Sequence, residues 1–373
     1  MLRKIVIFML LFSICSPSYA VDTAVIDVRE FSNLMKEFDN ELIDEDYEEI
    51  IGDITEGNFK FDYKKIFGNV GKILIKELRS NIGLAIQVIL IALIIGLLDN
   101  LKSSFSSEGV SQIAFYVCYV LLITLLLASF TNIYNIAKDF IEEISKFMNV
   151  LTPIIVGLIA STGGIATTSL IYPVIAFFSQ FITLFVSKVL LPVSMICFAL
   201  GIVNNISKRV SVSKVEGFLK SLSIWALGII LTLFVGIVSL EGTVASTVDG
   251  VTVKTAKFLF SGGIPVVGKL LGDSVDTILG STLIMKDAIG FVGITVIFGL
   301  ALVPIIKVLT VVLVYFVTGA VIEPFADSRI CKCLNSMKDA GGIILGMLVT
   351  VLVMFVIGTV MLLKITNSVA MYR

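Results

Sequence analysis

The chain has 373 residues, of which 57% are hydrophobic and 15% are charged, and its formal net charge is −1. Soluble proteins contain roughly 45–50% apolar and about 25% charged residues, so this composition excludes a soluble enzyme and indicates that lipid covers much of the apolar surface. The near-neutral charge gives no sign of a nucleic-acid partner. The chain has no histidine, so the commonest general base and metal ligand is missing.

The N-terminus has the three parts of a secretory signal. Arg3 and Lys4 precede a short apolar run from Ile5 to Ile14, and Ser18-Tyr19-Ala20 has the small-x-small pattern of a cleavage site. The pattern predicts a signal peptide over residues 1–20 that is cleaved after Ala20. The alternative is an uncleaved anchor. In both cases the next segment lies outside the cytoplasm.

Residues 21–80 form the one stretch with the composition of a soluble segment. The stretch is acidic between Asp39 and Glu49 and becomes amphipathic and basic toward Arg79. About sixty residues without a large core predict short helices that lie on the membrane or on a partner.

Two apolar spans are predicted within residues 81–148, from Ile82 to Leu98 and from Val110 to Phe130. Residues 131–149 then mix apolar side chains with five charged ones, including Lys138 and Glu142. This mixture favours an amphipathic helix at the membrane surface over a functional segment.

The remaining chain has the spacing of an internal duplication. Pro153 and Pro265 lie 112 positions apart, as do Pro192 and Pro304. The spacing predicts a first membrane repeat over residues 149–241, a polar linker over 242–260 and a second repeat over 261–373. Chance matches between apolar segments are the alternative.

Each repeat opens with a short segment that proline or glycine interrupts. In the first repeat, Pro153, Gly163 and Gly164 are the candidate helix breaks. Three longer apolar stretches follow, at 168–187, 189–203 and 222–240, and then at 283–302, 305–322 and 341–363. An odd number of crossings per repeat gives inverted repeats, whereas crossing by both opening segments gives parallel ones. The basic loop 204–221 favours a cytoplasmic position, and the sequence leaves both arrangements open.

The stretch from Glu241 to Gly290 places charges, glycines and a proline between strongly apolar spans. Charges at membrane depth must face water, pair or contact protein, and paired broken segments are typical of substrate paths in transporters. The candidate lining or gate residues of a conduit are Asp249, Lys254, Lys257, Gly262, Gly263, Pro265, Lys269, Asp273, Asp276, Lys286 and Asp287. The alternative is an extramembrane loop with solvated ion pairs.

No pattern indicates a nucleophile, a metal site or a bound cofactor. Cys331 and Cys333 form a lone C-x-C without histidine or a second pair, which does not indicate a zinc site. There is no Walker A loop, so energy-coupled transport would need a separate ATPase subunit.

Several motifs resemble those of one family. The segment Glu241–Phe258 (EGTVASTVDGVTVKTAKF), with Ile264–Gly268 and Leu283–Lys286, resembles the stage III sporulation protein AE family of endospore-forming bacteria. The resemblance implies an all-helical, multi-spanning subunit of the secretion-like channel that joins the mother cell to the forespore. The implied location is the mother-cell membrane around the forespore. The implied partners are the other stage III sporulation A group proteins, including an ATPase, and stage II sporulation protein Q on the forespore side. Membrane lipid is the further partner that the apolar composition predicts.

The resemblance implies no catalytic residue. Two further hypotheses stay open beside the channel subunit. One is a stand-alone transporter of small solutes with inverted repeats, and the other is a non-conducting scaffold of the same complex.

Overall fold

The computed structural model describes residues 51–53, 63–101, 108–162, 164–206, 212–263 and 267–371. Within these ranges the chain forms helices joined by short turns, with no strand. The helices are α4 (Tyr63–Leu101), α5 (Glu108–Ser161), α6 (Ile165–Phe185), the π-helical turn η1 (Val186–Leu190), α7 (Leu191–Ile206), α8 (Ser213–Gly263), α9 (Val267–Ile322) and α10 (Ser328–Met371). The predicted signal peptide, its cleavage site at Ala20 and most of segment 21–80 lie outside the described residues.

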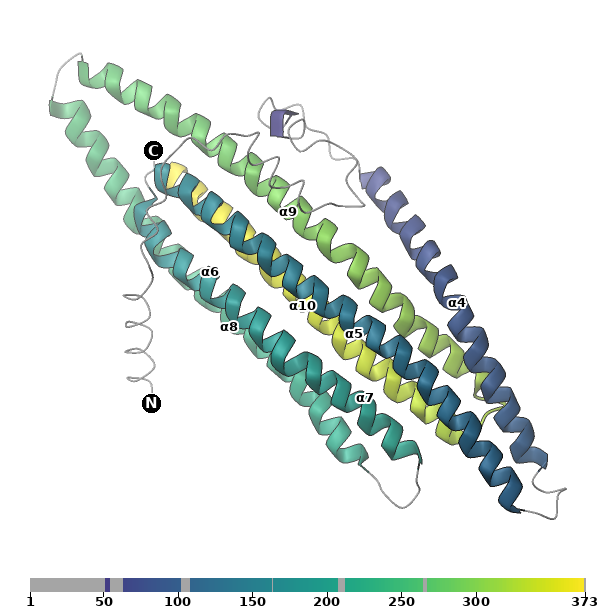
Figure 1. Ribbon diagram of the computed structural model, residues 1–373. Coiled ribbons are helices and arrows are strands. Elements are labelled where there is room, and N and C mark those ends of the chain that lie inside the picture. Colours follow the sequence, from purple (N-terminus) through teal and green to yellow (C-terminus); the bar gives the residue numbers. More distant parts are fainter. Residues whose placement is uncertain are drawn as a thin grey trace, which may run out of the picture.

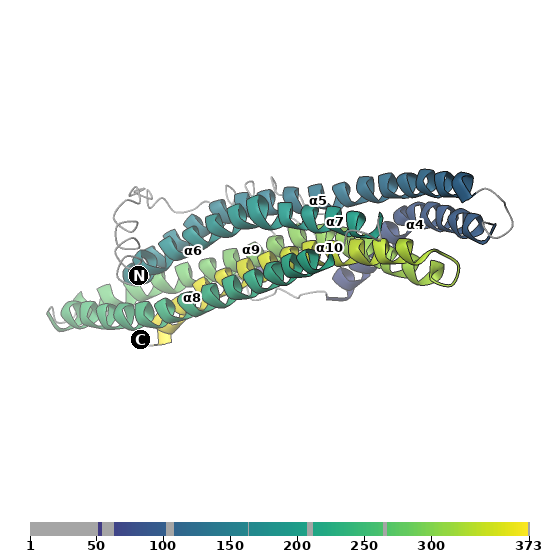
Figure 2. The ribbon, with the colours of Figure 1, turned by 90° about the horizontal axis from the view of Figure 1, so that it is seen from below.

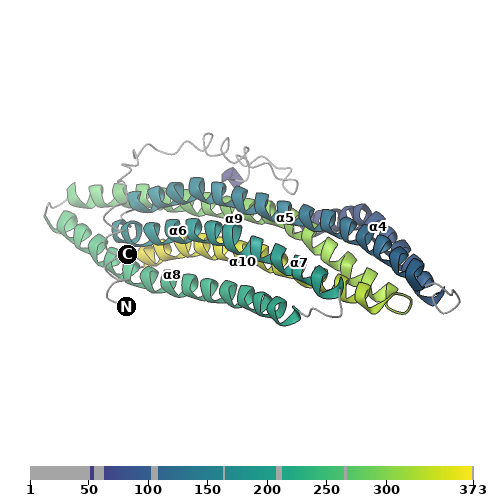
Figure 3. The same cartoon turned by 60° about the horizontal axis from the view of Figure 1, so that its bottom comes forward.

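Long antiparallel helices form one elongated bundle (Figure 1). α10 packs against α5, α6, α7, α8 and α9 and is the central helix. α4 and α8 lie on opposite sides of it (Figures 1 and 3). Seen from below, α5 follows the upper edge of the bundle and α8 the lower edge (Figure 2).

Six segments of the described chain are long and apolar enough to cross a membrane. They are Gly68–Leu97, Ile113–Ser161, Ile165–Asn204, Ser213–Asp249, Gly280–Ile322 and Ser328–Lys364. The protein is therefore an all-helical, polytopic membrane protein. α5 has 54 residues and is about 80 Å long at 1.5 Å per residue, whereas a bilayer has a hydrocarbon core of about 30 Å. The longest helices must therefore tilt strongly or extend beyond the hydrocarbon.

The helix break predicted at Pro153 is absent, because α5 continues through it to Ser161. A proline inside a helix costs about 3 kcal/mol. Here the apolar side chains around it pack into the bundle, and Leu151 and Ile155 are fully buried. Tertiary packing therefore outweighs the local cost. Residues 131–149, expected as a separate interfacial helix, form the middle of the same helix.

Two pairs of predicted stretches also merge into continuous helices. The stretches 283–302 and 305–322 join through Pro304 in α9. The stretches 168–187 and 189–203 join through η1, where the N–H of Leu191 donates to the carbonyl of Val186, five residues earlier. Pro192 follows directly and has no N–H to continue the ordinary α-helical pattern, which accounts for a wider turn at this point.

The two predicted repeats correspond to two helical hairpins with the same orientation. α7 meets α8 at the same end of the bundle at which α9 meets α10 (Figure 1). Parallel units follow if the two hairpins arose by duplication, and the duplication itself stays a prediction. The predicted boundaries at 149, 242 and 261 fall inside α5 and α8.

Small residues bring some of these helices into close contact. A Cβ atom on Gly290 of α9 would clash with a methyl group of Leu363 on α10, and one on Gly201 of α7 would clash with Cβ of Ser336 on α10. Close approach at small residues is the usual way in which helices associate within lipid. α10 is therefore held against α9 and α7 at positions that exclude a larger side chain.

The α5 polar face and the α5–α6 junction

One side of the middle of α5 is charged and exposed, while its other side is buried. Lys138 and Glu142 are 51% and 49% exposed and lie 3.8 Å apart as an ion pair. The exposed members of this side, which we call the α5 polar face, are Asn135, Lys138, Asp139, Glu142, Glu143, Lys146 and Asn149. On the opposite side Phe140, Ile144 and Phe147 are at most 2% exposed. Spacings of three and four residues place each set on its own side of the helix.

Contacts at both ends of this segment fix its level in the bundle. A Cβ on Gly293 of α9 would lie 2.7 Å from Leu151, and one on Gly341 of α10 would lie 2.8 Å from Val312 and 3.5 Å from Ile133. The α5 polar face therefore runs beside the part of α9 between Gly293 and Val312, and beside α10 from Gly341 onward.

The neighbouring helices are strongly apolar at this level. Residues 341–363 of α10 include no charged side chain, and residues 293–312 of α9 include only Lys307. Outward-facing Phe298 of α9 is 42% exposed. The α5 polar face thus lies at a level where lipid is expected around the bundle. Charges in hydrocarbon are costly and normally face water or protein, so this face needs a polar cover.

The π-helical turn η1 lies against α5 at this level. η1 contacts α5 and includes the exposed Lys188. Single π turns within α-helices are frequent at functional sites. Lys188 and the partly exposed Lys307 of α9 add positive charge to the bundle at the level of the α5 polar face.

Asp249 joins α8 to the start of α6. Its carboxylate accepts hydrogen bonds from the backbone N–H groups of Ala166 and Thr167, at 2.8 and 2.9 Å. Asp249 is only 2% exposed. The first N–H groups of a helix have no partner within the helix and favour a negative charge, so Asp249 acts as a cap supplied by a distant helix.

The helix break in the first predicted repeat lies at this junction. α5 ends at Ser161 and α6 begins at Ile165. A Cβ on Gly164 would lie 2.7 Å from the side chain and 3.0 Å from the carbonyl oxygen of Ile159, so the turn has no room for a side chain there. Gly163 lies outside the described residues. The structure thus brings together Asp249 and Gly164, two predicted candidate residues from different parts of the sequence.

Lys286 is fully buried in α9. Its Nζ donates to the carbonyl of Leu363 on α10 at 3.0 Å and lies 3.3 Å from the carboxylate of Asp287. The Asp287 side chain is 46% exposed. Lys286 therefore links α9 to α10 and does not point into a water-filled path.

The other predicted conduit residues are placed by the backbone alone. Lys254, Lys257, Gly262 and Gly263 lie in the last part of α8, and Lys269, Asp273 and Asp276 lie in the first part of α9. Their side chains, and Pro265 as a whole, lie outside what the structure describes. The structure does not bring any of them to the α5 polar face.

A third polar cluster lies where α7, α8 and α10 meet. Nζ of Lys220 lies 2.7 Å from Glu216 Oε1 and 3.1 Å from Asp339 Oδ2. The Glu216 side chain is 6% exposed. This cluster ties the α6–α8 hairpin to α10 and has the arrangement of a structural ion-pair network.

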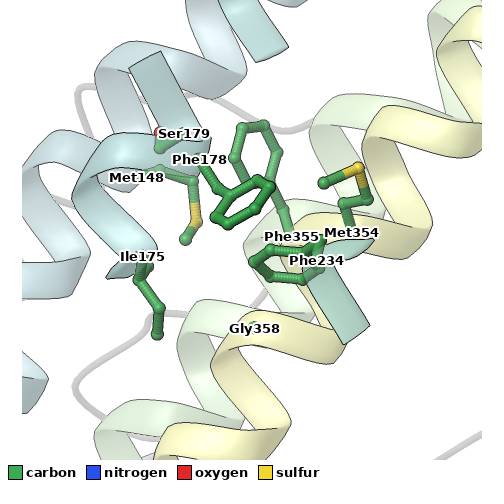
Figure 4. A pocket seen from close by; sticks show the side chains of 8 residues that line it. All are labelled: Met148, Ile175, Phe178, Ser179, Phe234, Met354, Phe355 and Gly358. Carbon is green, nitrogen blue, oxygen red and sulfur yellow. The ribbon is translucent and has the colours of Figure 1, made fainter. Parts of the chain in front are cut away.

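The centre of the bundle has a small apolar cavity. Met148, Ile175, Phe178, Phe234, Met354, Phe355 and Gly358 line it, together with Ser179 (Figure 4). The side chains of Met148 and Met354 lie on opposite sides of the rings (Figure 4). No group of three or more Cys, Asp and Glu residues within the described ranges could hold a metal ion. The charged side chains described above lie on the outside of α5 and where helices meet, and not in this cavity.

The α5 polar face is not among the functional residues that the sequence predicts. Charged amphipathic segments usually lie at the membrane surface, so the sequence predicts a surface helix for residues 131–149. The signal that could have found it is the apolar run Val150–Ser161 directly after it, since an uninterrupted helix would carry the charges to membrane depth.

Residues 45–366 match the family model described as stage III sporulation protein AE. The chain belongs to this family. It is also similar to stage III sporulation protein AE of Bacillus subtilis (strain 168), with 28% identity over 347 residues, which cover 93% of this chain and 87% of that protein. No solved structure matches the chain.

Proposed function

We propose that this chain is a non-enzymatic membrane subunit of the channel complex that joins the mother cell to the forespore during endospore formation. Membership of the stage III sporulation protein AE family supports the link to sporulation. Six apolar helices support a role within a membrane. The proposed location is the mother-cell membrane that surrounds the forespore.

The observation that carries the channel role is the α5 polar face. A membrane protein that works alone has little reason to present Lys138, Glu142 and Lys146 at a level where its other helices expose apolar side chains. A subunit of a channel complex can cover such a face with protein or with the water of a conduit. The packed, apolar interior of the bundle favours a path between subunits over a path through one chain.

The proposed partners are the other stage III sporulation A group proteins and stage II sporulation protein Q on the forespore side. The sequence has no nucleotide-binding loop, which fits a complex in which a separate ATPase supplies energy. We propose no cofactor for this chain.

The stand-alone transporter is the weaker proposal. Its structural argument was a pair of inverted repeats, but the α7–α8 and α9–α10 junctions lie at the same end of the bundle. Reconstitution decides the question directly. Flux of small solutes into vesicles that contain only the purified chain would support the transporter and contradict the channel-subunit proposal.

The proposal is tested in the endospore-forming bacterium that encodes this chain. Deletion should prevent heat-resistant spores after engulfment, and the wild-type chain should restore them. The tagged chain, solubilised from sporulating cells, should copurify with the other stage III sporulation A group proteins. Normal spores without the chain, or a chain that purifies alone under conditions that preserve the complex, would refute the proposal.

A charge-neutralised variant separates a conduit from a scaffold. Asp139→Asn, Glu142→Gln and Glu143→Gln together remove the acids of the α5 polar face and keep the shape of the helix. If copurification persists and spore formation fails, the face has a role beyond assembly, as a conduit requires. If both persist, the scaffold hypothesis is favoured. Asp53→Asn, an exposed change at a distance from α5 in sequence, is the matched control.

A further inference from the structure

We propose that the α5 polar face is the surface through which copies of this chain associate side by side within the membrane. This inference rests on the proposed membrane role and adds to it a partner, a second copy of the same chain. Three observations lead to it: the length of the face, its level in the bundle and the order of its charges.

The face is long enough to form a helix–helix interface within the bilayer. From Asn135 to Asn149 it extends about 21 Å at 1.5 Å per residue, against a hydrocarbon core of about 30 Å. Every third or fourth residue along this length is polar and exposed. Side chains at this spacing form one continuous row on a helix, which is the geometry that a neighbouring parallel helix can follow.

The level of the face argues against lipid as its cover. It lies between the contacts of Ile133 and Leu151 with α10 and α9, whose neighbouring segments contain almost no charged side chain. On α8, Leu233 is 54% exposed and Ile229 is 51% exposed. At this level the α8 side of the bundle therefore exposes large apolar side chains, whereas the α5 side exposes charged ones. Covering that side with protein costs less free energy than exposing several charges to hydrocarbon.

The order of charges favours a second copy as the cover. Lys138 and Lys146 flank the acids Asp139, Glu142 and Glu143 along the face. Copies inserted in the same direction are related by an axis along the membrane normal, so their α5 helices run in the same direction and each residue lies at the same height as its counterpart. Lys138 of one copy then lies one helical turn from Glu142 of the next, and the same holds for Glu142 and Lys146. Identical residues lie at equal heights on the two copies, and each lysine has an acid of the neighbour one helical turn away, so the ion pair within each copy is exchanged for pairs between copies.

The same arrangement explains why the α5 polar face has both positive and negative side chains. If the α5 polar face had charges of one sign only, the faces of two neighbouring copies would repel each other. Like charges directly opposite each other destabilise a pair of packed elements. Alternation along the helix offers each cation an acid above or below it on the neighbour.

Disulfide crosslinking in native membranes tests the association. In a full-length chain whose native cysteines are replaced by alanine, Asn135→Cys and Asn149→Cys place probes at both ends of the face without changing any charge. Oxidation should give an adduct of twice the chain mass at both sites. Leu233→Cys, at an exposed apolar site of α8, is the matched control and should give none.

Charge exchange tests the pairing between copies. Lys138→Glu should strongly reduce the adduct at Asn149→Cys, because like charges then meet across the interface. The combined change Lys138→Glu with Glu142→Lys should restore the adduct, since each copy again presents one cation one turn from one acid. A double swap that leaves the adduct at the level of the single variant would overturn the proposed pairing.

Each remaining outcome also decides the question. An adduct with a different protein, or no adduct together with probes that a membrane-impermeant maleimide labels freely, would overturn self-association. No adduct together with probes that the maleimide cannot reach would place the face in lipid or under another chain and would also overturn it. Spore formation is scored separately in the same strains. Normal spores without an adduct refute this inference and leave the proposed function standing.

Discussion

The carboxylate of Asp249 accepts a hydrogen bond of 2.8 Å from the backbone N–H of Ala166, which lies 83 positions earlier in the chain. The other carboxylate oxygen accepts the N–H of Thr167 at 2.9 Å. α8 thus supplies the cap that α6 lacks locally, because the residue before α6 is Gly164, which has no side chain. The turn between α5 and α6 and the far part of α8 form one structural unit through this single carboxylate.

Removal of the Asp249 carboxylate should loosen this unit. Asp249→Ala leaves the buried N–H of Thr167 and the partly buried N–H of Ala166 without this acceptor, and the loss of a helix cap costs about 0.5–2 kcal/mol. Asp249→Asn keeps one acceptor oxygen but loses the charge, so its cost should be smaller. Thermal unfolding of the purified chain in detergent, followed by far-ultraviolet circular dichroism, measures both. Asp53→Asn is the control, and equal unfolding temperatures for Asp249→Ala and wild type would contradict the cap.

Gly164→Ala should destabilise the same junction by a different route. The added methyl group would lie 2.7 Å from the Ile159 side chain and 3.0 Å from its carbonyl oxygen, so the backbone of the turn has to move. Overpacking of this kind costs about 1–3 kcal/mol. The methyl group added by Gly228→Ala in α8 would have no atom within 4 Å. Alanine is favoured over glycine inside a helix by up to about 1 kcal/mol.

The comparison of these two variants in one unfolding assay is the test. Gly164→Ala should lower the unfolding temperature and Gly228→Ala should leave it unchanged or raise it. If Gly164→Ala is as stable as wild type, the close contact with Ile159 is not a constraint on the turn.

Sequence patterns identified the apolar spans and the break between Ser161 and Ile165, because both depend on local composition. They failed at Pro153 and Pro304, where the packing of long helices against α10 outweighs the local cost of proline. They also could not predict that Asp249 and Ala166 meet, since that contact depends on how α8 crosses α6. The α5 polar face was visible as a charged segment, but its level became clear only from the contacts of Ile133 and Leu151.

The contact between Gly201 and Ser336 predicts a compensating pair of substitutions. A Cβ on Gly201 would clash with Cβ of Ser336 and lie 3.0 Å from its Oγ, so Gly201→Ala should push α7 away from α10 and lower stability. Ser336→Gly removes the atoms in conflict and should recover most of the loss in the double variant. A double-mutant cycle of unfolding free energies measures the coupling. Additive effects of the two substitutions would mean that the helices do not meet there as described.

The cluster of Glu216, Lys220 and Asp339 gives the last prediction. Lys220→Met leaves the nearly buried Glu216, with a side chain only 6% exposed, without the cation 2.7 Å away. Breaking a buried ion pair in this way costs about 3 kcal/mol or more. Asp339→Asn should cost less than about 1 kcal/mol, because the Asp339 side chain is 45% exposed.

A double variant separates the lost pair from the lost packing of the lysine stem. Glu216→Gln in the Lys220→Met background removes the uncompensated charge, so the double variant should be more stable than Lys220→Met alone. Unfolding in detergent over a denaturant series gives the three free energies. A double variant that is less stable than Lys220→Met would show that the buried carboxylate is held by groups other than Lys220, and the link between the α6–α8 hairpin and α10 would then rest on packing at Gly201.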